Sequence, residues 1–146
     1  MFKYRVDTLI SREDIAIRVK ELANEINKDF EGEEVLFVGL LRGSVVFLAD
    51  LVREIEVEAT MVFMTVSSYG NSTESSRDVK IIKDLEEDIR GRNVIIVEDI
   101  VDTGFTLRKV EDILMTREPK KLKIVTLLDK PERREVEIDV EYIGFK

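Results

Sequence analysis

The sequence predicts an α/β fold with a mainly parallel central sheet flanked by helices, and two observations lead to it. Short unbroken apolar runs alternate along the chain with segments whose apolar residues recur at helical spacing. The runs EVLFVGLL (34–41) and NVIIVED (93–99) have the composition of strands covered on both faces, and each leads through a glycine-containing turn into a helix. A chain of 146 residues is expected to form one domain, residues 1–146.

The first half of the chain supplies two helices and two strands in alternation. A helix is expected to begin at Ser11, whose hydroxyl can cap the first turn, and to end near Gly32. The apolar run 34–41 is the first strand, because it is short and continuous. A helix at 45–55 and a second strand at 59–68 follow.

Small polar residues dominate the segment 67–78, SSYGNSTESSRD, which predicts a loop that is long for so compact a chain. The elements expected after it are strands at 79–84, 93–99 and 122–128, a helix from Gly104 to about Glu118, and an alternating strand at 136–145. Pro119 ends the helix, since proline cannot continue it.

Composition excludes several kinds of chemistry. The sequence contains no Cys, His or Trp, so a disulfide framework, a Cys or His metal site, a thiol nucleophile and a Ser–His–Asp triad are all excluded. Its 23 basic and 31 acidic side chains give a net charge of −8, which argues against a nucleic-acid partner. We also see no signal peptide and no run long enough for a membrane span, so a cytoplasmic protein without a membrane partner is expected.

Ligands of parallel α/β sheets bind beyond the carboxyl ends of the strands. Three segments should meet there, namely LLRGS (40–44), EDIVDTGFT (98–106) and DKPERR (129–134). The second is the most informative. Glu98 and Asp99 stand side by side at the carboxyl end of a buried strand, and adjacent carboxylates suit a vicinal diol or a metal ion.

The turn that follows these acids has the features of a phosphate site. Backbone N–H groups at the start of a helix, together with the hydroxyls of Thr103 and Thr106, can bind a phosphate, and Gly104 permits positive φ or a close backbone approach. A phosphate site next to a diol site describes a ribose 5-phosphate. The alternative is an ordinary capped turn. Neither a P-loop nor a dinucleotide fingerprint is present.

The segment VIIVEDIVDTGFTL (94–107) resembles the phosphoribosyl-diphosphate motif of the type I phosphoribosyltransferases. With LLRGS, SSYG, VKIIKDL and LLDKPERR in the same order, nearly the whole chain is similar to the bacterial hypoxanthine phosphoribosyltransferases. The resemblance implies the type I phosphoribosyltransferase fold with a flexible lid loop at about 67–79. It also implies purine salvage, in which phosphoribosyl diphosphate and hypoxanthine or guanine give IMP or GMP and diphosphate.

The resemblance also assigns roles to matching residues. Asp102 matches the proposed general base, which faces N7 of the purine, and Lys130 matches the lysine that reads the 6-oxo group. The remaining positions are Glu98 and Asp99 for the ribose hydroxyls and Mg²⁺, Thr103, Gly104, Phe105 and Thr106 for the 5′-phosphate, Leu41, Arg42, Gly43 and Arg134 for diphosphate, and Ser67, Ser68, Tyr69 and Gly70 for the lid. A non-proline cis peptide bond often occurs in the family's diphosphate loop.

The sequence departs from the family at its end. Relatives continue past IGF with a segment that carries the aromatic ring stacked on the purine, and this hood segment is missing here. A non-catalytic nucleotide-binding module, or a truncated and inactive form of the enzyme, is therefore the alternative. A phosphatase using Asp99 ranks last, because the DxD spacing is lacking. The family usually forms dimers or tetramers, so a homodimer or homotetramer is expected.

Overall fold

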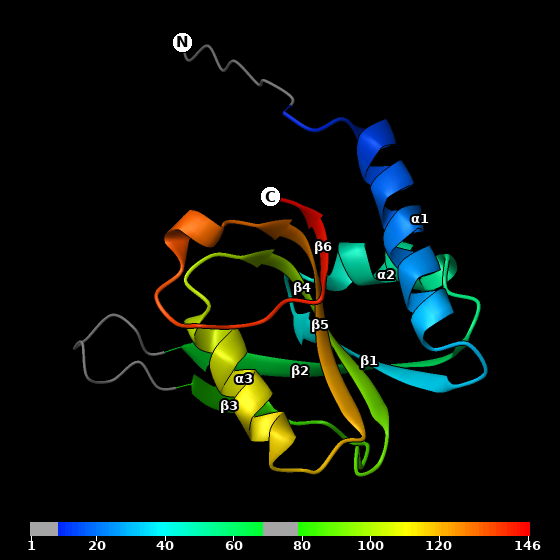
Figure 1. Ribbon diagram of the computed structural model, residues 1–146. Coiled ribbons are helices and arrows are strands. Elements are labelled where there is room, and N and C mark those ends of the chain that lie inside the picture. The colour runs from blue at the N-terminus through cyan, green and yellow to red at the C-terminus, as the bar shows by residue number, and fades with distance from the viewer. Residues whose placement is uncertain (1–8, 69–78) are drawn as a thin grey trace.

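A computed structural model describes residues 9–68 and 79–146 of the chain. The described residues form three α-helices and six strands. In chain order the elements are α1 (Arg12–Asp29), β1 (Glu34–Leu41), α2 (Val45–Arg53), β2 (Glu58–Ser68), β3 (Val79–Lys83), β4 (Asn93–Val101), α3 (Phe105–Met115), β5 (Lys121–Asp129), a short 3₁₀ turn (Pro131–Arg133) and β6 (Tyr142–Phe145). The predicted α/β class is confirmed (Figure 1).

The described strands lie in the order β3-β2-β1-β4-β5-β6. All neighbouring pairs are parallel except β2 and β3, which are antiparallel. The chain moves outward from β1 to β2 in one direction and from β4 through β5 to β6 in the other. The topological switch point, where such sheets bind ligands, therefore lies between the carboxyl ends of β1 and β4.

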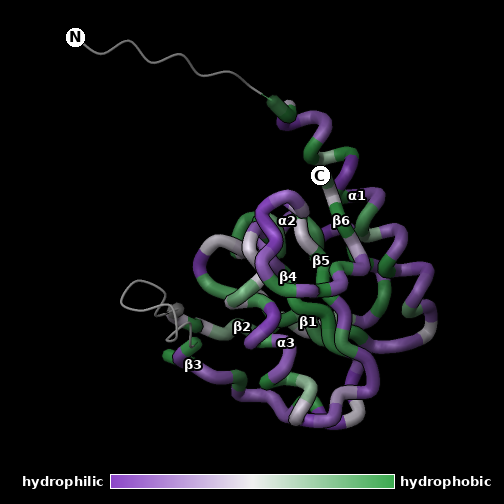
Figure 2. The backbone as a smooth tube through the Cα atoms, turned by 60° about the vertical axis from the view of Figure 1, so that its left-hand side comes forward, coloured by the Kyte–Doolittle hydropathy of each residue, from purple (hydrophilic) through white to green (hydrophobic). Residues whose placement is uncertain are grey.

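Two apolar layers cover the sheet. Helices α1 and α2 lie on one face and α3 on the other (Figure 1). The burial alternates along β1, since Val35 and Phe37 belong to the α1/α2 layer and Leu36 and Val38 to the α3 layer. This is why the central strands read as continuous apolar runs, and Figure 2 shows them as the hydrophobic interior of the molecule. Within the described part of the chain, no helix has the length and apolar character of a membrane span.

The first helix is capped as expected, because the Ser11 hydroxyl accepts a hydrogen bond of 3.0 Å from the N–H of Asp14. Other boundaries differ from the predictions. Helix α2 ends at Arg53 instead of residue 55, and α3 ends at Met115 instead of about Glu118. The backbone already leaves the helical conformation before the proline, since Glu118 has a φ of 57°.

The largest error concerns the predicted strand at 136–145, of which only Tyr142–Phe145 is a strand. Ile138 and Val140 alternate with polar residues because one side of this segment packs against the α3 layer, without strand pairing. The same alternation is typical of an edge strand, so periodicity could not separate the two cases. In contrast, β4 extends past the predicted residue 99 to Val101, so Glu98 and Asp99 lie inside the strand instead of at its end.

Candidate active site

Two of the three predicted segments line a single cavity at the switch point. This cavity has a volume of about 370 Å³ and is lined by Gly43 and by residues 98–104, 106 and 107. A Cβ atom built on Gly43 would lie 3.9 Å from the Cβ of Asp99, so the loops after β1 and β4 approach each other closely. The third segment adjoins the same loop, since the N–H of Lys130 donates to the carbonyl of Val101 at 2.9 Å.

The turn between β4 and α3 has the geometry expected of a phosphate cradle. Gly104 adopts a φ of 85°, a conformation that favours glycine, and it directly precedes the first residue of α3. The Thr103 hydroxyl accepts a hydrogen bond from the N–H of Phe105 at 3.4 Å. The cavity is therefore bordered by the positive end of a helix dipole, where anions bind.

The two adjacent acids sit in a partly buried and strongly negative environment. Burial raises the pKa of Glu98 to about 7, against the opposing effect of the hydrogen bond from the N–H of Asp99. The carboxylates of Asp99 and Asp102 contribute to this rise in the pKa of Glu98, and burial also raises the pKa of Asp99. Such shifts indicate a cluster that a cation would stabilise.

The donor set fits Mg²⁺ held jointly with a substrate. Among the described residues, no group of three or more acidic side chains could hold a metal ion by itself. Mg²⁺ sites commonly combine one or two carboxylates with substrate oxygens and water, and Glu98 and Asp99 line the cavity together.

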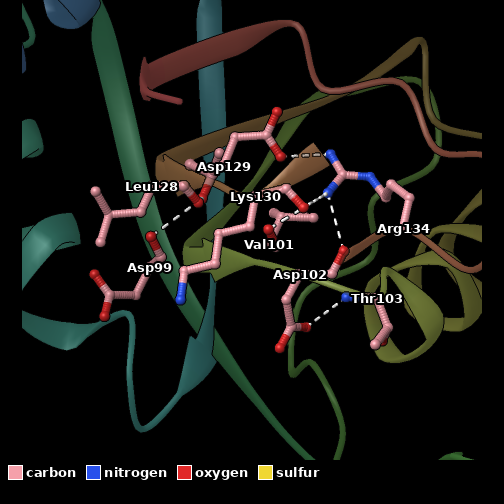
Figure 3. A network of polar contacts seen from close by, with 9 residues as sticks. Asp99, Val101, Asp102, Thr103, Leu128, Asp129, Lys130 and Arg134 are labelled. Atoms are coloured by element: carbon pink, nitrogen blue, oxygen red, sulfur yellow. Dashed lines mark hydrogen bonds and ion pairs between the residues drawn. The ribbon is translucent and has the colours of Figure 1, made fainter. Parts of the chain in front are cut away.

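Asp102 is exposed at the mouth of this turn, and its carboxylate accepts a hydrogen bond of 2.6 Å from the N–H of Thr103. A short local hydrogen bond of this kind fixes the direction of the side chain. Lys130 is also exposed, and its side chain extends on the side of the loop where Asp99 and Asp102 lie (Figure 3). The carboxylate of Asp102 is therefore accessible to a ligand in the cavity.

The other predicted positions have different surroundings. Leu41, Arg42 and Phe105 adjoin the cavity in sequence without lining it, and the peptide bond between Leu41 and Arg42 is cis. Ser67 and Ser68 are the last residues of strand β2 and not part of a loop as predicted, whereas Tyr69 and Gly70 lie outside the described residues.

The Arg134 guanidinium is bound to protein acceptors. One terminal nitrogen lies 2.5 Å from a carboxylate oxygen of Asp129, and the other donates to the carbonyl of Asp102 at 3.0 Å (Figure 3). The expected contact of Arg134 with diphosphate stays a prediction.

Sequence reasoning missed two residues that support the site. Asp129 is a buried acid that pairs with Arg134, and its position directly after an apolar strand was the available signal. Thr126 is fully buried, and its hydroxyl lies 3.1 Å from the carbonyl oxygens of both Asp99 and Leu128. It can donate to only one of them at a time, and donation to the carbonyl of Asp99 ties β5 to β4 beside the acidic pair. A threonine inside an apolar run gave no comparable signal.

Comparison with known proteins agrees with this geometry. The family model described as a phosphoribosyl transferase domain matches residues 6–146. Hypoxanthine phosphoribosyltransferase of Salmonella typhimurium is 54% identical over 145 residues, which cover 98% of this chain and 82% of the relative. The protein of the same name from Haemophilus influenzae is 52% identical over 149 residues, which cover 100% of this chain and 83% of that one.

Solved structures show the same fold. A Bacillus anthracis hypoxanthine-guanine phosphoribosyltransferase, crystallised with HEPES in its active site, has 51% identity and a TM-score of 0.92, covering 98% of this chain and 85% of that chain. A Trypanosoma cruzi hypoxanthine phosphoribosyl transferase has 36% identity and a TM-score of 0.91, covering 99% and 80%. The motifs, the fold and these relatives agree, and the chain belongs to the phosphoribosyltransferase family, within its hypoxanthine phosphoribosyltransferase branch.

Proposed function

We propose that this chain acts in purine salvage by transferring the 5-phosphoribosyl group of phosphoribosyl diphosphate to hypoxanthine or guanine, giving IMP or GMP. The observation that carries this proposal is the cavity at the switch point, which joins an acidic pair to a helix-start turn. A diol and a phosphate separated by one ribose ring need that combination.

The reaction is a displacement at the anomeric carbon of the ribose. N9 of the purine forms a bond to this carbon, while the bond to the diphosphate oxygen breaks and its electron pair leaves with diphosphate. The purine loses one proton, and Asp102 would accept it at N7; its exposed carboxylate, held by the N–H of Thr103, supports this role. Lys130 would donate to a 6-oxo group, which favours hypoxanthine and guanine over adenine.

Glu98 and Asp99 would hold the ribose hydroxyls and Mg²⁺, and the residues of the turn would hold the 5′-phosphate. When bound, Mg²⁺ neutralises charge that develops on the departing diphosphate. Arg42 is exposed on the loop after β1 and would add positive charge at the same place. Three acids without a cation would repel an anionic substrate, so substrate binding should depend on Mg²⁺.

A spectrophotometric assay of IMP formation from hypoxanthine, phosphoribosyl diphosphate and Mg²⁺ tests the proposal. Turnover of hypoxanthine and guanine is expected, with little turnover of adenine. Asp102→Asn should lower kcat while leaving IMP binding by calorimetry intact. Asp112→Asn is the matched control, because Asp112 is an exposed acid of α3 whose pairing with Arg108 lies outside the cavity.

Binding of GMP without turnover of any purine base would instead support a nucleotide-binding module. Equal loss of turnover and of IMP binding in Asp102→Asn would mean that Asp102 positions the ligand. Either result would require a change in the proposed role.

The proposal also covers the oligomeric state of the chain and its location in the cell. We expect a homodimer or homotetramer, as the resemblance implies, and Val45 and Val46 at the start of α2 are exposed apolar candidates for the contact. We also expect a cytoplasmic protein. Light scattering would measure the assembly, and fractionation of the cells would test the location.

A further inference from the structure

The ion pair between Arg134 and Asp129 differs from the other ion pairs of the described residues in its burial. The Arg134 side chain is 19% exposed and the Asp129 side chain 5%, whereas every other described pair includes a partner at least 43% exposed. Withdrawing two charges from water is costly unless their hydrogen bonds are satisfied. A buried pair beside a ligand cavity therefore calls for a specific reason.

The guanidinium joins two separate segments of backbone. One terminal nitrogen donates to the carbonyl of Asp102 at 3.0 Å and lies 3.4 Å from that of Val101 and 3.5 Å from that of Lys130 (Figure 3). The other nitrogen is held by Asp129, which lies opposite Val101 in the sheet. The planar guanidinium of arginine suits this role, since one rigid group can donate hydrogen bonds to several acceptors.

The contact fixes the peptide groups around Asp102. Its carbonyl is held by Arg134, and its carboxylate by the N–H of Thr103. The carbonyl of Thr103 in turn accepts from the N–H of Glu135 at 3.0 Å, and the N–H of Lys130 donates to Val101. These hydrogen bonds connect the turn that carries Asp102 to the loop that carries Lys130.

We infer that Arg134 is a positioning residue. Held by Asp129, it fixes the turn that carries Asp102 against the loop that carries Lys130. It thereby keeps a constant distance between Asp102, which accepts the proton, and Lys130, which recognises the 6-position of the purine. This inference rests on the proposed function. It replaces a direct contact of Arg134 with diphosphate by a contact with the backbone. Errors in such alignment reduce the rate strongly without preventing binding.

The first test is steady-state kinetics of Arg134→Lys, which keeps the charge but loses the planar fork. A positioning role predicts that kcat falls on the order of 10- to 100-fold, with an unchanged KM for phosphoribosyl diphosphate and a weaker preference for hypoxanthine over adenine. Arg133→Lys is the matched control, since Arg133 is the exposed neighbour, and it should keep its kcat. A raised KM for phosphoribosyl diphosphate in Arg134→Lys, with kcat retained, would overturn the inference in favour of direct diphosphate binding.

The double variant Asp129→Leu/Arg134→Met guards against misfolding, because it leaves no unpaired buried charge. It should fold and show the same fall in kcat as Arg134→Lys. A folded double variant with the kcat of the unchanged protein would refute the positioning role.

Amide hydrogen exchange gives a readout that needs no turnover. Protection of the Lys130 and Glu135 N–H groups should fall in Arg134→Lys and persist in Arg133→Lys. Unchanged protection in both variants would overturn the inference. If the unchanged protein turns over no purine base, the proposed function fails. The exchange experiment still tests whether Arg134 holds the turn that carries Asp102 against the loop that carries Lys130.

Discussion

Gly104→Ala is the most informative single change, because Gly104 is constrained in two independent ways. Its φ of 85° lies in the left-handed region, where a Cβ atom is strained. A Cβ atom there would also lie 3.3 Å from Cγ2 of Ile138 and 3.4 Å from Cγ2 of Val136. The segment 136–138 therefore rests directly on the turn that we propose binds the 5′-phosphate.

Gly91 separates the two constraints. It has a φ of 71°, and a Cβ atom there would meet nothing within 4 Å. The left-handed conformation costs about 1–2 kcal/mol, and the lower entropy of the unfolded alanine chain offsets about 0.4–1 kcal/mol. Gly91→Ala should therefore lower the free energy of unfolding by about 1 kcal/mol. Overpacking adds at least about 1 kcal/mol, so Gly104→Ala should lower it by about 2 kcal/mol or more.

Urea unfolding followed by circular dichroism measures both variants, and initial rates give the KM for phosphoribosyl diphosphate. We expect the larger loss of stability and a raised KM only in Gly104→Ala. Equal losses of stability in the two variants would show that the contacts with Val136 and Ile138 contribute nothing. A more stable Gly104→Ala would refute the reasoning altogether, since it would mean that the turn adopts another conformation.

Three further changes test other parts of the molecule. Between pH 4.5 and about 7 the folded protein keeps a proton on Glu98 that the unfolded chain has released. The stability that this group contributes is therefore present at low pH and is lost, by up to about 3 kcal/mol, as the pH rises. Glu98→Gln should flatten the pH dependence of the unfolding free energy in urea titrations, and an unchanged pH dependence would contradict this reasoning. Lys130→Ala should bring the kcat/KM values for hypoxanthine and adenine closer together, and an unaltered ratio would exclude Lys130 from recognition of the 6-position. Ser11→Ala should cost about 1 kcal/mol of unfolding free energy through the lost cap, without changing kcat, and no loss in urea titrations would mean that the cap is not used.

The predictable part of the molecule follows from short-range patterns. The strand at 34–41 and the start of α1 at Ser11 were correct because burial on both faces and side-chain capping leave a mark on consecutive residues. The family resemblance, which comparison confirms, came from consecutive motifs in the same way. The segment 136–141 was wrong, because its alternation comes from packing on the α3 layer instead of strand pairing.

The sequence by itself determined the fold class, the order of the elements and the segments that meet at the carboxyl edge of the sheet. Only the tertiary structure decided how these segments are joined. Asp129 ends β5, and Arg134 follows five residues later in a charged segment where most side chains are solvated, so nothing local shows that the pair is buried. Burial and the carbonyl acceptors of Val101 and Asp102 depend on β4 lying beside β5, which is a long-range contact. For that reason the charge of Arg134 could be read from the sequence, but the group that it binds could not.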